Sequence, residues 1–260
     1  MAKLGNLTVG DVVKIKVGGN ATNFIVVQQG RPSTAYSSDC DGTWVITEKV
    51  YGSSMYWDST NNDYENSDVH SYLNSTFYNL IDSNLRGFIK TVKIPYTKGT
   101  GDTGTVKTNT NGLSTKIFLP SFREVAFGST TAGDVNIEGV ILTLFKENGV
   151  NARKVNNQWW LRSPETNSGT SGFVASVQAQ GSYREVSATG EKLYIRPMFI
   201  LPTDLATDKN GNVVVSSFSG YANIGSVNKE LSGGYANIGG AWKEISTAYK
   251  NIGGVWKEMA

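Results

Sequence analysis

The sequence is poor in cysteine, proline and charge. A single cysteine, Cys40, in 260 residues excludes an intramolecular disulfide and any zinc site built from several cysteines. Six prolines against 29 glycines favour a turn-rich chain with many short strands. Only 18% of the residues are charged, the net charge is +2 and no run of Lys or Arg occurs, so we expect no nucleic-acid partner.

Long hydrophobic runs are also missing. No apolar stretch reaches the ~18 residues that a membrane-spanning helix needs, so we expect no membrane insertion. The first residues, Met-Ala-Lys-Leu-Gly-Asn, contain no apolar signal segment, and we expect synthesis in a cytoplasm without standard export. A hydrophobic content of 39% still suffices for one domain of about 200 residues and a small second unit.

Two apolar strands, each containing an arginine, organise the chain. They are predicted over residues 158–164 and 194–202. Adjacent residues of a strand point to opposite faces, so one of the two neighbouring tryptophans should be buried, and the other should lie under a loop or at a surface. Each arginine should pair with a carboxylate or carbonyl and hold a loop in place, a role favoured over direct ligand contact. The predicted structural framework is Trp159, Trp160, Arg162 and Arg196.

Apolar periodicity and capping residues predict the other elements. Strands are predicted over residues 11–17, 23–29 and 44–47. Helices are predicted near Asn66 or Ser67, after Asp82, at the capping-box pattern of Ser121 to Glu124, and over residues 138–148. Strands followed by helices and then by strands indicate an α+β domain.

The segment between the two arginine strands is rich in Gly, Ser, Thr, Gln and Asn. We interpret residues 165–192 as a display surface, because such side chains form adaptable recognition surfaces; an ordinary polar loop is the alternative. The candidate ligand-binding residues are Asn167, Ser168, Gln178, Gln180, Tyr183 and Arg184. Tyr56, Trp57 and Tyr64 are candidates for stacking on sugar rings, although aromatic residues are as often part of a core.

The end of the chain is a tandem repeat with a period of 14 residues, whose units begin at Tyr221, Tyr235 and Tyr249. Each unit is predicted to form a β-hairpin, and so short a segment cannot bury a sufficient core alone. The candidate residues for oligomerisation or attachment are Tyr235, Trp242, Tyr249 and Trp256. The predicted organisation is a domain at 1–203, a linker at 204–220 and three hairpin repeats at 221–260.

The acidic residues near position 60, the histidine and the cysteine could take part in metal binding or catalysis, but a structural role is favoured for each. Asp58, Asp63 and Asp68, with Glu65, are weak calcium candidates, but their spacing fits no standard loop and suits a polar turn equally well. His70 has no nucleophile placed beside it by a motif, so a surface or capping role is favoured. Cys40, flanked by two aspartates, is expected to be an inert thiol.

Five short segments occur in the same order as in a domain family of unknown function from Firmicutes and their phages, which the chain therefore resembles. They are Val9 to Val13, Asn66 to Asn74, Val92 to Tyr96, Trp159 to Pro164 and Ile195 to Pro197. That family is similar to C-type lectin-like domains and to the formylglycine-generating-enzyme fold, which implies an antiparallel sheet with short helices. The paired cysteines of the formylglycine enzymes are missing here, so that activity is not carried over.

The tail resembles tandem repeats at the ends of tail proteins of phages that infect Gram-positive hosts. Together the two resemblances imply a virion component made in the bacterial host cytoplasm, non-enzymatic and without a cofactor. Its expected role is attachment to a surface carbohydrate or protein of the host, as a homo-oligomer, with a trimer among the options, bound to other virion proteins. A structural or decoration protein of the capsid, neck or baseplate is the alternative, and a cell-wall hydrolase is less favoured.

Overall fold

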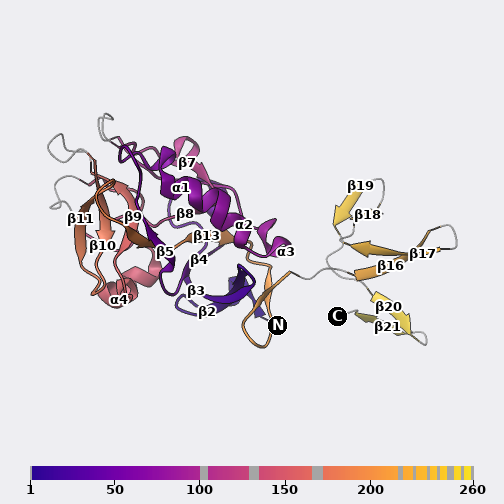
Figure 1. Ribbon diagram of the computed structural model, residues 1–260. Coiled ribbons are helices and arrows are strands. Elements are labelled where there is room, and N and C mark those ends of the chain that lie inside the picture. The colour runs from indigo at the N-terminus through magenta and orange to yellow at the C-terminus, as the bar shows by residue number, and fades with distance from the viewer. Residues whose placement is uncertain are drawn as a thin grey trace. The chain divides into compact units, whose positions relative to one another are not determined.

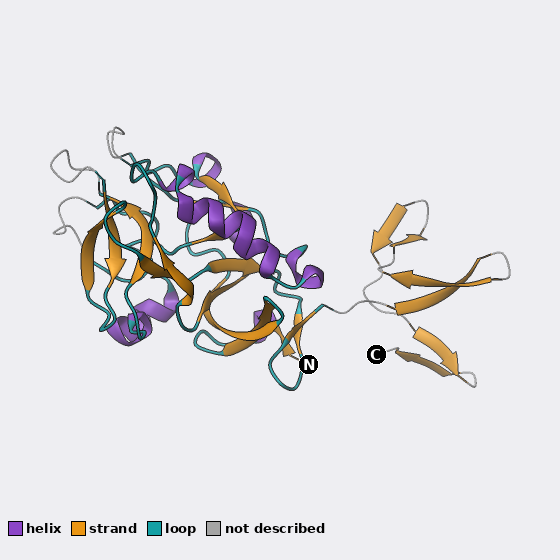
Figure 2. Cartoon of the chain, viewed as in Figure 1, coloured by secondary structure: helices purple, strands orange, loops and turns teal. Residues whose placement is uncertain are grey.

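The computed structural model describes residues 2–99, 105–128, 135–165 and 172–215, together with the backbone of the strands in the remaining C-terminal segment. The chain divides into two compact units, Met1–Val214 and Val215–Ala260. The division falls inside residues 204–220, the segment that the sequence predicts as a linker. The N-terminal unit mixes sheets with short helices and is of the α+β class (Figures 1 and 2).

The first five-stranded sheet of the N-terminal unit has the order β2-β3-β4-β13-β8. Every neighbouring pair in it is antiparallel. Its strands are β2 (Val12–Val17), β3 (Asn20–Gln29), β4 (Thr43–Thr47), β13 (Met198–Leu201) and β8 (Ile117–Phe118). Of the three inner strands, β4 and β13 are buried along their whole length, so residues 43–47 and 198–201 form the centre of the core.

The second five-stranded sheet has the order β11-β10-β9-β12-β5. Its strands are β11 (Tyr183–Ser187), β10 (Phe173–Val177), β9 (Trp159–Pro164), β12 (Leu193–Ile195) and β5 (Tyr51–Met55). The expectation of an antiparallel sheet is not met throughout, because β12 runs parallel to β9. The second predicted arginine strand is split between the two sheets. Its first part, β12, pairs with β9 in this sheet, and after Arg196 and Pro197 the chain continues as β13 in the first sheet.

Both tryptophans of β9 are buried, although the sequence led us to expect one of them under a loop or at a surface. All six residues of the strand are buried, so the sheet is covered on both faces here. The indole N–H of Trp159 donates to the Arg153 carbonyl at 3.2 Å, and that of Trp160 donates to the Met55 carbonyl at 3.0 Å. The polar atom of each buried ring is thus satisfied.

The helices lie over the first sheet and at the end of the second (Figure 1). They are α1 (Asp68–Tyr72), continued by a π-helical turn (Leu73–Phe77) and α2 (Tyr78–Leu80), then α3 (Ser83–Arg86) and α4 (Thr143–Arg153). Ser67 caps α1 by accepting from the His70 amide at 3.1 Å, and Asp82 caps α3. The capping pattern thus locates both starts correctly.

Helix α4 begins five residues later than the predicted start at Glu138. The side chain of Glu138 is buried among polar groups, and Gly139 adopts a φ of +82°, outside the helical region. Gly149, predicted to end the helix, does interrupt it with a φ of 51°, but helical turns resume up to Arg153.

Smaller elements complete the N-terminal unit. They are β1 (Ala2–Lys3), β14 (Ala206–Thr207), β15 (Val213–Val214), β6 (Val92–Ile94), β7 (Leu113–Thr115) and short 3-10 helices at Leu4–Asn6, Ser38–Cys40, Tyr64–Asn66 and Asn109–Asn111. The strands β1, β14 and β15 form a separate three-stranded sheet with β14 in the middle. Backbone pairing therefore ties residues 206–214 to the N-terminal end of the chain.

The C-terminal unit contains three antiparallel strand pairs. They are β16 (Ser219–Ile224) with β17 (Val227–Ser232), β18 (Tyr235–Ile238) with β19 (Ala241–Glu244), and β20 (Tyr249–Ile252) with β21 (Val255–Glu258). The second pair sets Tyr235 opposite Glu244 and Asn237 opposite Trp242. The side chains of the four predicted attachment residues lie outside the described part of the structure.

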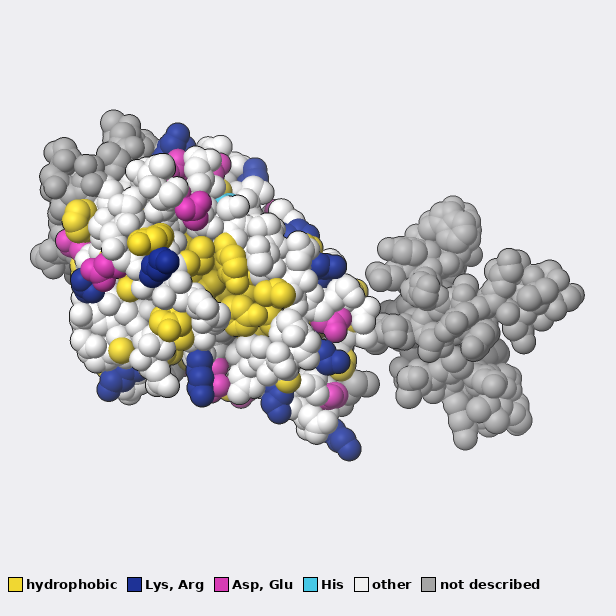
Figure 3. Space-filling model, viewed as in Figure 1, with side chains coloured by type: hydrophobic (Ala, Val, Ile, Leu, Met, Phe, Trp, Pro, Cys, Tyr) yellow, Lys and Arg dark blue, Asp and Glu magenta, His cyan; other side chains and the backbone are white. Residues whose placement is uncertain are grey.

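Charged side chains of both signs are scattered over the face of the N-terminal unit that Figure 3 shows, and they form no large patch of one sign there. This distribution agrees with the net charge of +2. Among the described residues, no helix combines the length and the apolar character needed to cross a membrane.

Candidate functional site

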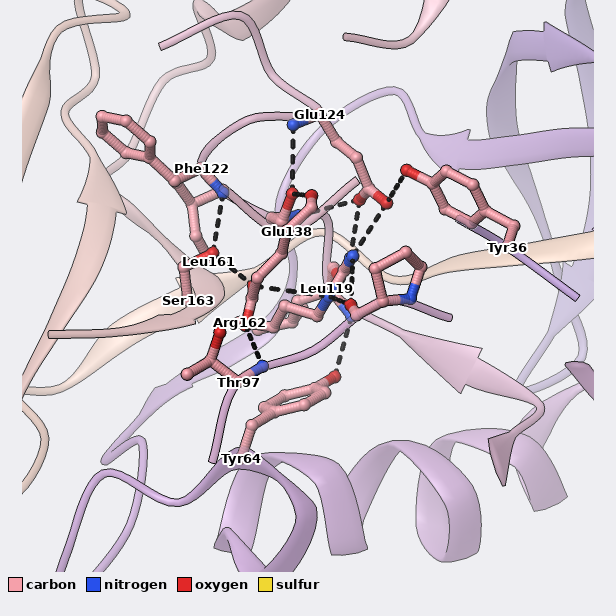
Figure 4. Close-up of polar contacts among 12 residues, drawn as sticks. Tyr36, Tyr64, Thr97, Leu119, Phe122, Glu124, Glu138, Leu161, Arg162 and Ser163 are labelled. Atoms are coloured by element: carbon pink, nitrogen blue, oxygen red, sulfur yellow. Dashed lines mark hydrogen bonds and ion pairs between the residues drawn. The ribbon is translucent and has the colours of Figure 1, made fainter. Parts of the chain in front are cut away.

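Arg162 of β9 lies at the centre of a network of buried polar groups (Figure 4). Its guanidinium donates to Glu124 twice, from Nη1 to Oε2 at 2.6 Å and from Nη2 to Oε1 at 2.8 Å. Two parallel bonds to one carboxylate fix orientation as well as charge. Burial alone would lower the pKa of Arg162, but Glu124 raises it above its ordinary value, so the guanidinium stays charged.

The remaining donor capacity of Arg162 goes to backbone carbonyls. Nη1 donates to Leu119 at 2.8 Å, while Nη2 and Nε donate to Pro95 at 3.0 and 3.3 Å. Together with the two bonds to Glu124, these make five hydrogen bonds, which equals the number of N–H donors of a guanidinium. One side chain thus joins β9 to the chain at Pro95 and at residues 119–124.

Glu124 completes a capping box without the predicted helix. The Ser121 amide donates to Glu124 Oε2 at 2.9 Å, and the Glu124 amide donates to Ser121 Oγ at 3.0 Å. The chain forms a turn instead, because Ala126 takes a φ of 61° and Arg162 holds the carboxylate. The Tyr36 hydroxyl also donates to Glu124, at 2.7 Å. Burial, followed by the charge of Glu124, raises the pKa of Tyr36 and keeps it a donor.

Glu138 brings a second carboxylate into the network. Its oxygens accept from the Thr97 amide at 2.5 Å and from the Ser163 hydroxyl at 2.6 Å, and its Oε2 lies 3.8 Å from Arg162 Nε. Burial raises the pKa of Glu138, and Arg162 opposes this shift. Since one guanidinium faces two carboxylates, hydrogen bonds rather than a second cation stabilise Glu138.

Residues next to three separate segments of the chain are held by backbone and side-chain contacts near the network. Thr97 precedes residues 100–104, Val135 follows residues 129–134, and Glu165 precedes residues 166–171. Val135 and Glu165 form a β-bridge, and the Asn62 amide donates to the carbonyls of Glu165 and Phe173 at 2.9 and 3.0 Å. These contacts hold Thr97 on Glu138 and hold Val135 and Glu165 to each other.

Arg196, the second framework arginine, is held by carbonyls rather than by a carboxylate. It donates to Thr47 at 3.1 Å, to Ala152 at 3.1 Å and to Glu48 at 3.3 Å, and it lies 5.0 Å from the ring centroid of Trp159. Burial lowers the pKa of Arg196 to about 10, and Glu48 opposes the shift. The contacts of both arginines are those that a framework role requires.

The display candidates that the structure describes lie in the turn between β10 and β11 and on β11 itself. Gln178 and Gln180 lie together in the turn between β10 and β11, where Gln180 Nε2 donates to Gln178 Oε1 at 2.9 Å. Asn167 and Ser168 lie outside the described residues.

The other two display candidates, Tyr183 and Arg184, are neighbours on β11, so their side chains point to opposite faces of the sheet. The ring of Tyr183 packs on Phe122 and its hydroxyl donates to Glu165 at 3.0 Å. Arg184 donates to the half-exposed Glu191 at 2.6 Å. These two side chains therefore lie on different faces of β11.

Of the three aromatic residues proposed for sugar stacking, Trp57 and Tyr64 are in the core. Trp57 Nε1 donates to the Leu161 carbonyl at 3.0 Å, and the Tyr64 hydroxyl accepts from the Leu119 amide at 2.9 Å. Tyr56 is exposed, with Lys192 Nζ 4.9 Å from its ring centroid.

The calcium candidates form turns and caps. Asp58 accepts hydrogen bonds from Thr60, Asn61 and Asp68, and these bonds lower its pKa even though burial opposes them. Asp63 accepts from Asn66. Within the described ranges, no three acidic, histidine or cysteine side chains come close enough to hold a metal ion.

His70 is half-buried, with Nε2 3.2 Å from the Thr115 hydroxyl and Nδ1 3.1 Å from the Glu65 carbonyl. Its ring lies 5.1 Å from that of Tyr64. Burial lowers the pKa of His70. These contacts make it a packed residue rather than the surface or capping residue that was expected, since Ser67 provides the cap.

Cys40 is buried, and burial raises the pKa of its thiol to about 11. We expect alkylation by iodoacetamide at pH 8 to be roughly 200-fold slower in the folded protein than in urea, from the difference in thiolate fraction against an ordinary pKa of about 8.5. Mass spectrometry over time measures both rates. Equal rates would show that the thiol is accessible and ionised.

The sequence did not reveal the partners of the network. Glu124 appeared only as a helix cap and Glu138 only as a helix start, while Tyr36 and Thr97 gave no signal. A usable signal was the pair of arginines in apolar strands, because a buried guanidinium requires carboxylates or carbonyls from elsewhere in the chain.

The sequence comparisons give one family. Its model, described as a domain of unknown function, DUF6273, matches residues 41–203, which include β4 to β13 and the whole Arg162 network except Tyr36. Comparison with curated proteins and with solved structures gives no match. The chain belongs to the DUF6273 family.

Proposed function

We propose that the protein is a non-enzymatic attachment component of a phage or phage-like particle, which binds a carbohydrate or protein on the surface of a bacterial host. The N-terminal unit is proposed to be C-type-lectin-like and to carry the binding surface. The C-terminal repeats are proposed to form hairpins that join copies of the chain or attach it to other virion proteins.

The observation that carries this proposal is the use of the buried charges. The charged groups of Arg162, Glu124 and Glu138 make their contacts inside the protein. The Glu138 carboxylate holds the Thr97 amide, and a backbone bridge joins Val135 to Glu165. A rigid scaffold that holds loop ends in place is the usual support for a recognition surface. The same residues would be unavailable as catalytic acids or bases.

Repetition in the tail supports a multivalent arrangement. Each strand pair of the C-terminal unit is a two-stranded element, and an isolated pair of this kind is marginal in water. Association between copies would bury additional surface. It would also multiply weak contacts into useful avidity.

Binding of the purified full chain to intact cells and wall fragments of Gram-positive bacteria tests the proposal. A matched chain ending at Val215 keeps β14 and β15, whereas one ending at Asp204 would remove β14, which pairs with β1, and β15, which pairs with β14. We expect host-restricted binding that falls about 100-fold when the repeats and the oligomer are lost.

Two substitutions test the display residues in the same assay. Asn167→Ala and Gln180→Ala should weaken binding, whereas Lys146→Ala, at an exposed position of α4, should not. An intact oligomer that binds no host would contradict attachment and favour the structural alternative.

That alternative is a decoration or baseplate protein that binds other virion proteins. Two exposed apolar side chains favour it, since Ile137 and Phe173 lie next to the residues that the network fixes. Large apolar groups at a surface are typical of contacts with another protein. Burial of both residues in a complex with a virion protein would support this second role.

A further inference from the structure

The strand pair β18–β19 of the C-terminal unit has two faces of different composition. Residues opposite each other in an antiparallel pair share a face, and so do residues two apart along one strand. Tyr235 is opposite Glu244, and Asn237 is opposite Trp242. These four residues therefore lie on one face, which we call the acidic aromatic face.

The other face of β18–β19 is basic. Ala236 is opposite Lys243, and Ile238 is opposite Ala241. We call the face with these four residues the basic aliphatic face. It contains a lysine and no acidic residue, whereas the acidic aromatic face contains a glutamate and no lysine. The register thus places opposite charges on the two faces of one strand pair.

The strand pair β20–β21 repeats this arrangement. Its acidic aromatic face consists of Tyr249, Asn251, Trp256 and Glu258, and its basic aliphatic face consists of Lys250, Ile252, Val255 and Lys257. All four residue types of the acidic aromatic face are the same in the two strand pairs. On the basic aliphatic face, two alanines of β18–β19 are replaced by Lys250 and Val255. One of these changes adds a second positive charge to the basic face, so the difference between the faces is kept.

The strand pair β16–β17 differs at the tryptophan position, where Asn228 lies opposite Asn223. Its charged residues keep their places, because Glu230 is opposite Tyr221 and Lys229 is opposite Ala222. Glutamate and lysine are therefore on opposite faces in all three strand pairs, even in the one that lacks tryptophan.

Each strand pair is a two-stranded sheet of its own, which is marginal in water until another layer covers it. Contact between two acidic aromatic faces would bring glutamates together, and contact between two basic aliphatic faces would bring lysines together, so both are unfavourable. Contact between unlike faces matches glutamate with lysine. It also lets a lysine lie over an aromatic ring and an aliphatic residue pack on one.

A second copy of this chain provides the unlike face. Every copy carries both kinds of face, so the C-terminal unit is complementary to itself. If strand pairs of one chain stack on one another in this way, the stack still ends in one acidic aromatic face and one basic aliphatic face. A contact between unlike faces joins copies head to tail, and it closes into a ring where the rotation between copies allows it.

We propose that copies of the chain associate through their repeats, with the acidic aromatic face of a strand pair in one copy packed on the basic aliphatic face of a strand pair in the next. This inference rests on the proposed role of the repeats in joining copies. It identifies the two faces that meet and a second copy as the partner.

Reversal of the charges of one face at a time tests the contact. One variant carries Glu244→Lys and Glu258→Lys, and the other carries Lys243→Glu and Lys257→Glu. We expect each variant of the full chain to associate at least about tenfold more weakly than the wild type, because like charges then meet across the contact. The variant with all four substitutions should associate as the wild type does, since its faces are again of opposite charge. Sedimentation velocity over a range of protein concentrations measures the association.

Asp39→Lys with Glu147→Lys is the matched control. Both residues are exposed in the N-terminal unit, and the double substitution changes the net charge as much as the two glutamate substitutions in the repeats do. It should leave the association unchanged. The proposed contact is overturned if the wild-type chain is a monomer, if the two single-face variants associate as the wild type does, or if the variant with four substitutions associates no better than they do.

The binding of these variants to host cells keeps this inference separate from the proposed function. Host binding by a chain whose association ignores the charge reversals would leave the attachment role standing while the contact between unlike faces fails. Association that follows the charge reversals, in a chain that binds no host, would support the contact and contradict the attachment role.

Discussion

Replacing Arg162 by methionine is expected to lower the free energy of unfolding by about 3–5 kcal/mol, because it leaves Glu124 buried without its cation. The substitution also removes the donors to the carbonyls of Leu119 and Pro95. Each of those oxygens is then less well satisfied inside the core. Urea unfolding of the full chain, followed by tryptophan fluorescence, measures the change.

Arg184→Met is the matched control, since Arg184 also donates to a glutamate at 2.6 Å. Its side chain and that of Glu191 are 40% and 44% exposed, so solvent screens the pair and its loss should change the stability by less than about 1 kcal/mol. Similar effects of the two substitutions would show that burial does not decide the strength of the Arg162 contact.

A double variant tests whether the charges act as a unit. Glu124→Gln alone leaves Arg162 without its closest carboxylate, whereas Arg162→Met with Glu124→Gln removes both charges together. The double variant should be less destabilised than the sum of the two single variants, because residues in one network are coupled. Strict additivity would contradict the network.

The local parts of this fold could be predicted from sequence. Alternating apolar residues located β2, short apolar segments located β3 and β4, and the side chains of Ser67 and Asp82 located two helix starts. These features depend on residues within a few positions of one another. The burial of Arg162 and Arg196 followed from their apolar neighbours in the same way.

The long-range parts could not be predicted. Glu124 lies 38 residues before Arg162, and its local pattern with Ser121 indicates a helix cap. The cap forms, but the helix does not, because the buried guanidinium holds the carboxylate in a turn. The local preference for a helix is weak compared with the free-energy cost of an unpaired buried charge, so tertiary contacts determine the conformation of this segment.

The aromatic residues show the same limit. Those that the sequence suggested for sugar contact include Trp57 and Tyr64, which are buried in the core. Residue type alone did not separate packing from recognition.

Replacing Gly139 by alanine is expected to destabilise the protein by about 3 kcal/mol or more, since a side chain here meets two obstacles at once. Gly139 has a φ of +82°, a region that residues with a Cβ rarely adopt. A Cβ would also lie 2.0 Å from the Tyr36 hydroxyl oxygen and 2.8 Å from the ring carbon that bears it. Tyr36 would have to move, and with it the hydrogen bond to Glu124.

Gly10→Ala isolates the first obstacle, the backbone strain, because Gly10 also has a positive φ, of +100°, but a Cβ there meets no atom within 4 Å. Its cost should be limited to backbone strain of about 1 kcal/mol. Combining Gly139→Ala with Tyr36→Phe should relieve part of the clash, since the closest atom is the hydroxyl oxygen. Equal unfolding free energies for Gly139→Ala and Gly10→Ala would mean that Tyr36 yields freely, and that its bond to Glu124 contributes little to holding the network together.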